Sequence, residues 1–249
     1  MDSTNASFPS RRSLIQIGRG KPIGSNELHQ MGITLRHINN LVQHGWLEPL
    51  GRGVYVRQGQ ELTFEHAMEY LTRSIPDLHI ASMTAVKWHN GIHYVNKDVP
   101  TAVWGTSTPR LPKWFMERFD CTYQVTQLFS PDMPRDLGLD ALSATHPTLY
   151  VSSPERALLE MIGDIGKKFT IEEVADVARN MQSIRLPLLN DLVGYTVRIK
   201  VLRILFRLAR ESRASWGDDV NNQVGRSDAT ARSTGTRGMS ASTSKVYPL

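Results

Sequence analysis

This 249-residue sequence lacks disulfide-forming cysteine pairs, long apolar runs and a leader-like N-terminus. Its only cysteine is Cys121, which excludes an internal disulfide and is typical of proteins in a reducing compartment. No segment approaches the roughly 20 apolar residues that span a bilayer. The N-terminal residues MDSTNASFPSRRS are polar and contain no apolar signal-peptide core. We therefore expect a cytoplasmic protein of two small domains that makes no membrane contact.

Recognisable catalytic and cofactor-binding signatures are also missing. The segments GRGKPIG and GRGVY do not end in the Gly-Lys-Ser/Thr of a P-loop. His89 and His93 have the spacing of a zinc HExxH motif, but Asn90 replaces its glutamate. Ser152 stands before a helix-like segment, where capping together with Glu155 explains it. We expect no metal and no cofactor, and no cluster of acids, histidines or nucleophiles supports a nuclease or a transferase.

Charge is distributed unevenly along the chain. The formal net charge is +5, but residues 1–60 carry +4, residues 61–193 carry −5 and residues 194–213 carry +5. Local basic segments of this kind are the electrostatic feature of proteins that bind polyanions. Solvated helix faces rich in Lys and Arg give the same pattern, so charge alone favours neither interpretation.

The N-terminal segment has the signals of two short helices joined by a turn. Ser25 is placed to cap the first helix, and Gly32 supplies the turn. Thr34 is placed to cap the second helix, which we expect to run to about His44 before Gly45 ends it. Helix, glycine turn and helix together form the outline of a helix-turn-helix motif.

The second helix is amphipathic, and its polar face has an unusual composition. At 100° per residue, one side collects Leu35, Ile38, Leu41 and Val42. The other side carries Arg36, Asn39, Asn40 and Gln43, with His37 and His44 at its edges. Guanidinium groups pair with guanine, and side-chain amides pair with adenine, because their planar donors and acceptors match the base edges. No acidic residue lies between Thr34 and Leu47 to repel phosphate.

Two short strands are predicted directly after this helix, around Gly51-Arg52-Gly53. Both glycines are expected to allow a positive φ angle in the turn. Arg52 at the tip would reach phosphate or the minor groove, while Lys21 and Arg57 would hold the phosphate backbone. The pattern predicts a winged helix-turn-helix over residues 10–60. The alternative is a helix and hairpin that only pack on the next domain.

The segments after Leu62 predict a mixed α/β domain over residues 61–216. Helical patterns occur in TFEHAMEYLTRSI, MTAVKWHNGIHYV and TIEEVADVARNM, the last with a Thr170–Glu173 capping box. TAVWGT and CTYQVTQLF have strand character, and LYVSSPERALLEMIGDI indicates a strand that enters a helix. Residues 217–249 are rich in Ser, Thr, Gly and Arg, and we expect a disordered tail there. The fold class expected for the whole chain is α+β.

The predicted helix VRIKVLRILFRLARE carries a basic stripe. Lys200, Arg203, Arg207 and Arg210 fall on one side of it. A solvated face is the simplest interpretation of this stripe. The alternatives are a second phosphate contact, an anionic partner surface, or pairing with carboxylates from the acidic middle of the chain.

Five segments follow one another along this chain: HGWLEPLGRGVYVR, MTAVKWHNGIHYV, LPKWF, VSSPERALLEMI and VRIKVLRILFRLA. In this order they resemble the AbiEi-type antitoxins of type IV toxin–antitoxin (abortive infection) systems, over residues 10–216. After Trp216 the sequence lacks the glycine- and lysine-bearing turn and closing strand of such proteins.

The resemblance implies a winged helix that binds and represses the operon's own promoter. It also implies a functional partner, a nucleotidyltransferase-like toxin, that the antitoxin neutralises without a required stable complex. The matching stretch assigns groove reading to Arg36, His37, Asn39, Asn40 and Gln43, and the wing role to Arg52. We therefore expect a transcriptional autorepressor and antitoxin that binds double-stranded DNA at inverted repeats. The alternative is a protein-interaction module whose acidic middle domain binds a protein partner.

Overall fold

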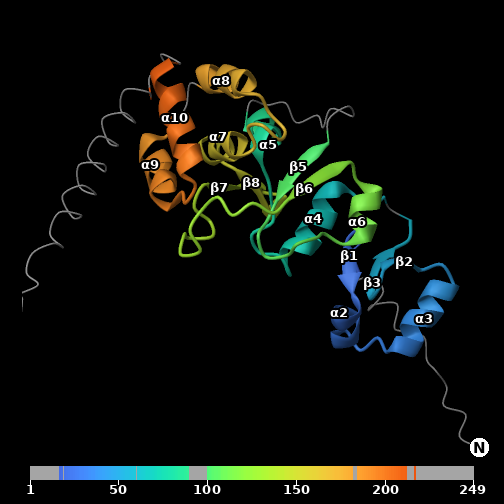
Figure 1. The fold of residues 1–249 in the computed structure, drawn as a ribbon. Coiled ribbons are helices and arrows are strands. Elements are labelled where there is room, and N and C mark those ends of the chain that lie inside the picture. Colours follow the sequence, from blue (N-terminus) through green and yellow to red (C-terminus); the bar gives the residue numbers. More distant parts are fainter. Residues whose placement is uncertain are drawn as a thin grey trace, which may run out of the picture.

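The computed structural model describes residues 17–18, 20–59, 61–89, 100–181, 184–211 and 216. Figure 1 shows an N-terminal unit of strands and two helices at one end, a larger sheet in the middle and a group of helices at the other end. Both parts of the chain contain helices and strands, which confirms the predicted mixture of the two. His93 and the predicted disordered tail, residues 217–249, lie outside the described residues.

The N-terminal unit consists of two helices and a small antiparallel sheet with strand order β1-β3-β2. Its elements are β1 (Pro22–Gly24), α2 (Ser25–Gln30), α3 (Leu35–Gln43), β2 (Leu47–Gly51) and β3 (Val54–Arg57). Thr34 caps α3 as predicted, because its hydroxyl accepts a hydrogen bond from the His37 backbone N–H. The predicted cap at Ser25 is wrong by one residue. Gly24 is the N-cap of α2, and its N–H donates to the Glu27 carboxylate at 2.8 Å.

The larger sheet has five strands in the order β6-β5-β4-β8-β7. They are β4 (His79–Ile80), β5 (Thr101–Trp104), β6 (Cys121–Gln124), β7 (Leu139–Ser143) and β8 (His146–Ser152). The pairs β4–β8 and β5–β6 are parallel, whereas β4–β5 and β7–β8 are antiparallel. The two-residue strand β4 lies at the centre of the sheet, so His79 is placed between two neighbouring strands.

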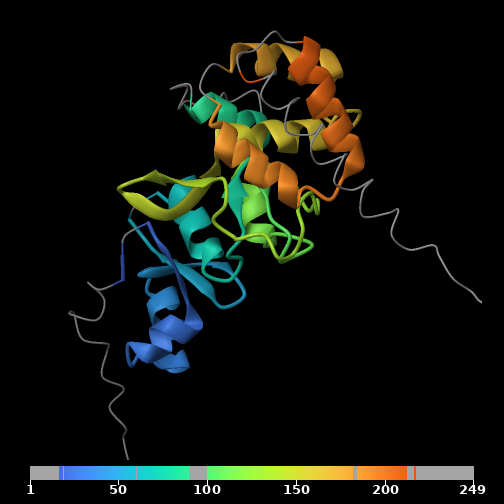
Figure 2. The same ribbon diagram turned by 90° about the vertical axis from the view of Figure 1, so that its left-hand side faces the viewer.

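Helices cover both faces of this sheet. They are α4 (Phe64–Thr72), α5 (Ser82–His89), α6 (Lys113–Arg118), α7 (Pro154–Gly163), α8 (Ile171–Asn180), α9 (Leu186–Tyr195) and α10 (Ile199–Glu211). Figures 1 and 2 show α5 and α7 to α10 on one side of the sheet and α4 on the other. Among the described helices, none has the length and apolar character needed to cross a membrane.

The hairpin β2–β3 contributes to two hydrophobic cores. Leu47 belongs to the small core of the N-terminal unit, which also contains buried residues of α2 and α3. Leu50 and Val56 belong to the large core around α7. Arg118 Nη2 also donates to Glu48 Oε1 at 2.6 Å, and Arg73 pairs with Glu27. The N-terminal unit is therefore joined to the rest of the chain by apolar and ionic contacts.

The N-cap of α7 differs from the prediction by one residue. Ser153, not Ser152, is the N-cap, and its hydroxyl accepts a hydrogen bond from the Arg156 N–H at 3.3 Å. Ser152 is the last residue of β8 and turns its hydroxyl to the Glu160 carboxylate instead. The capping box of α8 is present as predicted, with Thr170 and Glu173 bonded reciprocally.

Candidate nucleic-acid interface

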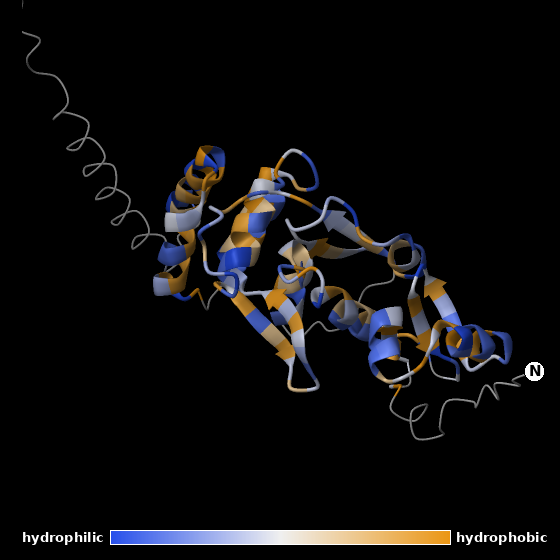
Figure 3. Cartoon of the chain, turned by 90° about the horizontal axis from the view of Figure 1, so that it is seen from below, coloured by the Kyte–Doolittle hydropathy of each residue, from blue (hydrophilic) through white to orange (hydrophobic). Residues whose placement is uncertain are grey.

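The polar face of α3 is turned toward solvent. Arg36, Asn39 and Gln43 are exposed, and His37 and Asn40 are partly exposed. Ile38 and Leu41, on the opposite side of the helix, are fully buried in the small core. The described part of the larger domain therefore does not cover the face that was predicted to read bases. Figure 3 shows hydrophilic residues over much of the two helices nearest the N-terminus.

Two apolar side chains near the ends of α3 are exposed. For one of them, Leu35, the helical wheel predicted burial. Leu35 was placed on the buried side, but it is the first residue of α3 and is 58% exposed. Trp46, which follows the helix, is 47% exposed. Leu35 lies at the edge of the apolar arc of the wheel, beside Asn39, whereas Ile38 and Leu41 lie nearer its centre and reach the small core. Both side chains flank the polar face and are available for contact with a partner.

The hairpin tip lies against α6. Its two glycines, Gly51 and Gly53, meet different structural requirements. Gly53 has a φ angle of +72°, which glycine adopts readily. Gly51 does not have a positive φ angle, so that part of the prediction is wrong. A Cβ atom on Gly51 would instead lie 2.8 Å from Cδ1 of Trp114, closer than van der Waals contact allows. Arg52 is exposed at this tip, beside a cavity of about 420 Å³ that Lys113 also lines.

Lys21 and Arg57 lie together at the other end of the small sheet. Pro22 is opposite Val56 in the β1–β3 pair, so Lys21 and Arg57 occupy the next positions of the two strands. Arg57 is also opposite Leu47, just after the end of α3. The structure thus brings two of the predicted phosphate contacts close to the C-terminal end of α3, and it places Arg52 at the far end of the hairpin.

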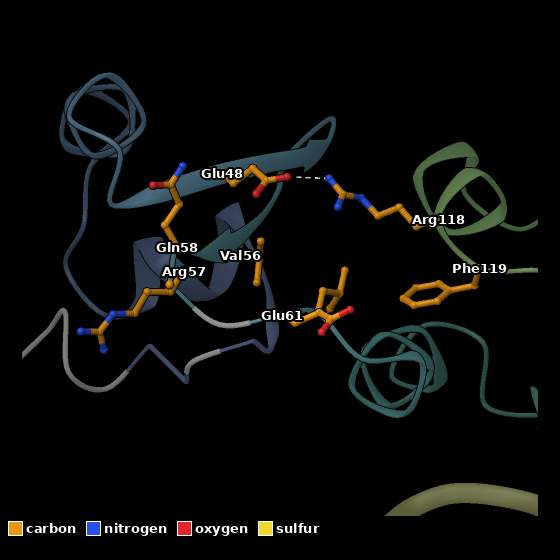
Figure 4. A pocket seen from close by; sticks show the side chains of 9 residues that line it. Glu48, Val56, Arg57, Gln58, Glu61, Arg118 and Phe119 are labelled. Atoms are coloured by element: carbon orange, nitrogen blue, oxygen red, sulfur yellow. Dashed lines mark hydrogen bonds and ion pairs between the residues drawn. The ribbon is translucent and has the colours of Figure 1, made fainter. Parts of the chain in front are cut away.

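A cavity of about 540 Å³ separates the base of the hairpin from α6. Figure 4 shows that the Arg57 side chain extends away from this cavity, whereas Glu48 points across to Arg118. Glu61 and Gln58 also line it, so the cavity carries both signs of charge. Arg57 is partly exposed, and this arrangement directs its guanidinium away from the cavity (Figure 4).

The basic stripe of α10 is exposed as the wheel predicted, with all four of its side chains at the surface. One of them already has an anionic partner, because Arg207 Nε donates to Glu211 Oε1 at 2.8 Å. Lys200 Nζ lies 3.5 Å from the Ile165 carbonyl oxygen. Within the described residues, pairing with a carboxylate therefore accounts for one member of the stripe. The remaining three are compatible with a solvated face, a second phosphate contact or an anionic partner surface.

A buried polar network at the centre of the larger domain was not predicted. The Glu160 carboxylate is fully buried and accepts hydrogen bonds from His79 Nε2, Ser82 N, Ser152 Oγ and Arg156 Nε, at 2.9–3.1 Å. Burial alone would raise the pKa of Glu160, but the donors and the charges of His79 and Arg156 outweigh it and lower the pKa.

The network has a structural role, because it holds the backbone at the start of α5. Ser82 is a non-glycine residue with a φ angle of +58°, a strained conformation that the Glu160 contact helps to hold. The signal in the sequence was the placement of Arg156 and Glu160 four residues apart on an apolar helix. The lone thiol has no catalytic character either, because burial raises the pKa of Cys121 to about 11.

Comparisons with known proteins define the class. The structure is similar to the crystal structure of the RV2827C protein from Mycobacterium tuberculosis, with a TM-score of 0.51 and 16% sequence identity, over 80% of this chain and 75% of that chain. At this identity the similarity shows a shared fold. No match was found among curated proteins.

Two family models match consecutive parts of the chain. Residues 11–97 match the N-terminal domain of the AbiEi antitoxin transcriptional regulators, and residues 100–246 match the AbiEi antitoxin transcriptional regulator of type IV toxin–antitoxin systems. The protein is thus a transcriptional regulator by class. It belongs to the AbiEi antitoxin family of type IV toxin–antitoxin systems, which confirms the resemblance seen in its sequence. The second match continues beyond Trp216, where the recurring sequence segments end.

Proposed function

We propose that the protein is the sequence-specific autorepressor of its own operon and the antitoxin of that operon's toxin. The N-terminal unit, within residues 10–60, acts as a winged helix-turn-helix, in which α3 is the recognition helix and β2–β3 is the wing. Residues 61–216 form the antitoxin domain. The operator is double-stranded DNA with inverted repeats, because two copies of the protein on two half-sites multiply specificity.

The outward polar face of α3 is the observation that carries the proposal. Arg36, Asn39 and Gln43 are exposed on one side of a nine-residue helix that contains no acid. A helix of this length is about 13.5 Å long, and its diameter with side chains, about 10–12 Å, matches the major groove, which is about 12 Å wide. His37 and Asn40 flank these three residues and complete the base-reading face.

The cationic residues of the small sheet would grip the DNA backbone on either side of the groove. Lys21 and Arg57 lie near the C-terminal end of α3, and Arg52 lies at the wing tip. The five-residue strand β2 separates these positions by about 17 Å. That separation is comparable with the width of a DNA duplex, so both ends can contact phosphates of one site.

The antitoxin role follows from the family and concerns the larger domain. The partner in this proposal is a nucleotidyltransferase-like toxin, neutralised without a stable complex. The α10 stripe of Lys200, Arg203 and Arg210 would provide a second anionic contact if neutralisation involves nucleic acid.

Fluorescence anisotropy with the upstream DNA of the operon and a scrambled duplex of equal length tests the DNA-binding part. Each bidentate base contact discriminates by about 1–3 kcal/mol, so Arg36→Ala and Gln43→Ala should each lower the preference for the operator by about 5- to 150-fold. Arg179→Ala, an exposed arginine on the distant α8, is the matched control and should change nothing.

Wild-type affinity of both variants for both duplexes would refute the base-reading role of α3. The larger domain would then be better explained as a protein-binding module with the N-terminal unit as its scaffold. Toxin neutralisation in cells, measured with the same variants, separates the two roles, because it should survive the loss of operator recognition.

A further inference from the structure

A second type of site is formed where α4 meets the β7–β8 hairpin. His66 and Glu69 are three residues apart on α4, and His146 is the first residue of β8. One ligand atom from each of these residues lies within 4.8 Å of the other two. Figure 2 shows the hairpin beside α4, although the two elements are far apart in the sequence.

The geometry within this cluster matches that of metal ligands better than that of a hydrogen bond. His146 Nδ1 lies 3.3 Å from Glu69 Oε1, yet this nitrogen makes no hydrogen bond to any described residue. The Nδ1 atom of His66 is likewise buried without a hydrogen-bond partner among the described residues. Two ligand atoms at about 2.05 Å from a tetrahedral zinc ion are about 3.3 Å apart. One edge of a zinc coordination sphere is therefore already present.

The cluster is partly shielded from solvent. The Glu69 side chain is 13% exposed and that of His146 is 22% exposed, so the site is shielded from bulk water but open to entry. The Glu69 carboxylate supplies a negative charge next to the two imidazoles, and the ammonium group of Lys21 acts on His66 in the opposite sense.

We propose that His66, Glu69 and His146 bind one Zn²⁺ ion, with water at the fourth position. Two imidazoles and one carboxylate form a known zinc ligand set, and neutral imidazole suits zinc better than calcium or magnesium. The ion would tie α4 to the β7–β8 edge of the larger sheet. Zinc would therefore stabilise the packing of α4 on this sheet.

The test uses the full-length chain after EDTA treatment and removal of the chelator. Zn²⁺ is titrated in competition with a chromophoric chelator, and Co²⁺ serves as a spectroscopic probe. We expect one Zn²⁺ per chain, a rise in the melting temperature with zinc concentration, and the intense visible absorption of tetrahedral Co²⁺. His66→Ala, His146→Ala and the nearly isosteric Glu69→Gln should each weaken binding by at least about tenfold.

The control is His29→Ala, which removes an exposed histidine from α2 and should leave zinc binding unchanged. Circular dichroism of the metal-free variants shows whether each one folds, and Glu69→Gln keeps the size of the side chain if an alanine variant does not. Wild-type zinc affinity in the three ligand variants would overturn the proposal. So would the absence of stoichiometric binding by the wild-type chain.

Discussion

Removal of the wing-tip arginine should change how DNA affinity depends on salt, not which sequence is preferred. Arg52 is exposed at the tip, far along the hairpin from Lys21 and Arg57. If these three residues each neutralise one phosphate, the slope of log K against log salt is about −2.7 per copy. Raising the salt from about 50 to 200 mM should then weaken wild-type binding about 40-fold. In Arg52→Ala the slope should be about −1.8, and the same change in salt should weaken binding only about 12-fold.

Anisotropy titrations at four or more salt concentrations, with operator and scrambled DNA, measure both quantities. Arg52→Ala should lose affinity equally for the two duplexes and keep the wild-type ratio between them. Arg179→Ala serves again as the exposed-arginine control and should keep the wild-type slope. A wild-type slope in Arg52→Ala would show that α6 holds the wing tip away from the DNA. A changed preference between the duplexes would show instead that Arg52 reads bases.

Three further predictions concern the framework that positions this interface. Ser152→Ala should lower the free energy of unfolding by about 1.5–3 kcal/mol, because it removes a hydrogen bond to the charged Glu160. Ser153→Ala should lower it by only about 1 kcal/mol, because it removes a helix cap. Urea denaturation measures both losses, and a larger loss in Ser153→Ala than in Ser152→Ala would contradict the cap assignment. Gly51→Ala should destabilise by about 1–3 kcal/mol, because its Cβ meets Trp114, and the same titration would show no loss if the tip were not packed on α6. The lowered pKa of Glu160 means that its contribution to stability is complete above the unfolded carboxyl pKa of about 4.3 and is lost as the pH falls below it. Denaturation between neutral and acidic pH should show this loss in the wild type and a weaker one in E160Q.

Local signals predicted several features of the N-terminal unit. The cap at Thr34, the end of α3 before Gly45 and the turn between β2 and β3 all depend on interactions within a few residues. The helical spacing of apolar residues in α3 also identified its buried side, because Ile38 and Leu41 are the residues that reach the small core. These features could be predicted because each is fixed by a few neighbouring positions.

Other features depend on contacts between distant segments, and local patterns could not supply them. The spacing of Ser152 and Glu155 predicted Ser152 as the cap, but in the fold its hydroxyl bonds to Glu160 and Ser153 caps the helix instead. The central strand β4 has two residues and therefore no readable periodicity. The zinc-ligand candidates gave a partial signal, since His66 and Glu69 have helical i, i+3 spacing, but His146 is 77 residues further along the chain than Glu69.

Gly51 couples the N-terminal unit to the larger domain, so the unit is not an independent module on a flexible tether. Its missing side chain lets Trp114 of α6 lie directly against the hairpin, and Leu50 and Val56 of the same hairpin are buried in the large core. The face of α3 is fixed to this hairpin through Leu47, which is buried in the small core. A displacement of α6 would therefore move the hairpin together with α3 and reposition the proposed DNA-binding face relative to the larger domain. If the proposed function holds, binding of a partner to the larger domain would change operator affinity by this route without contact to α3.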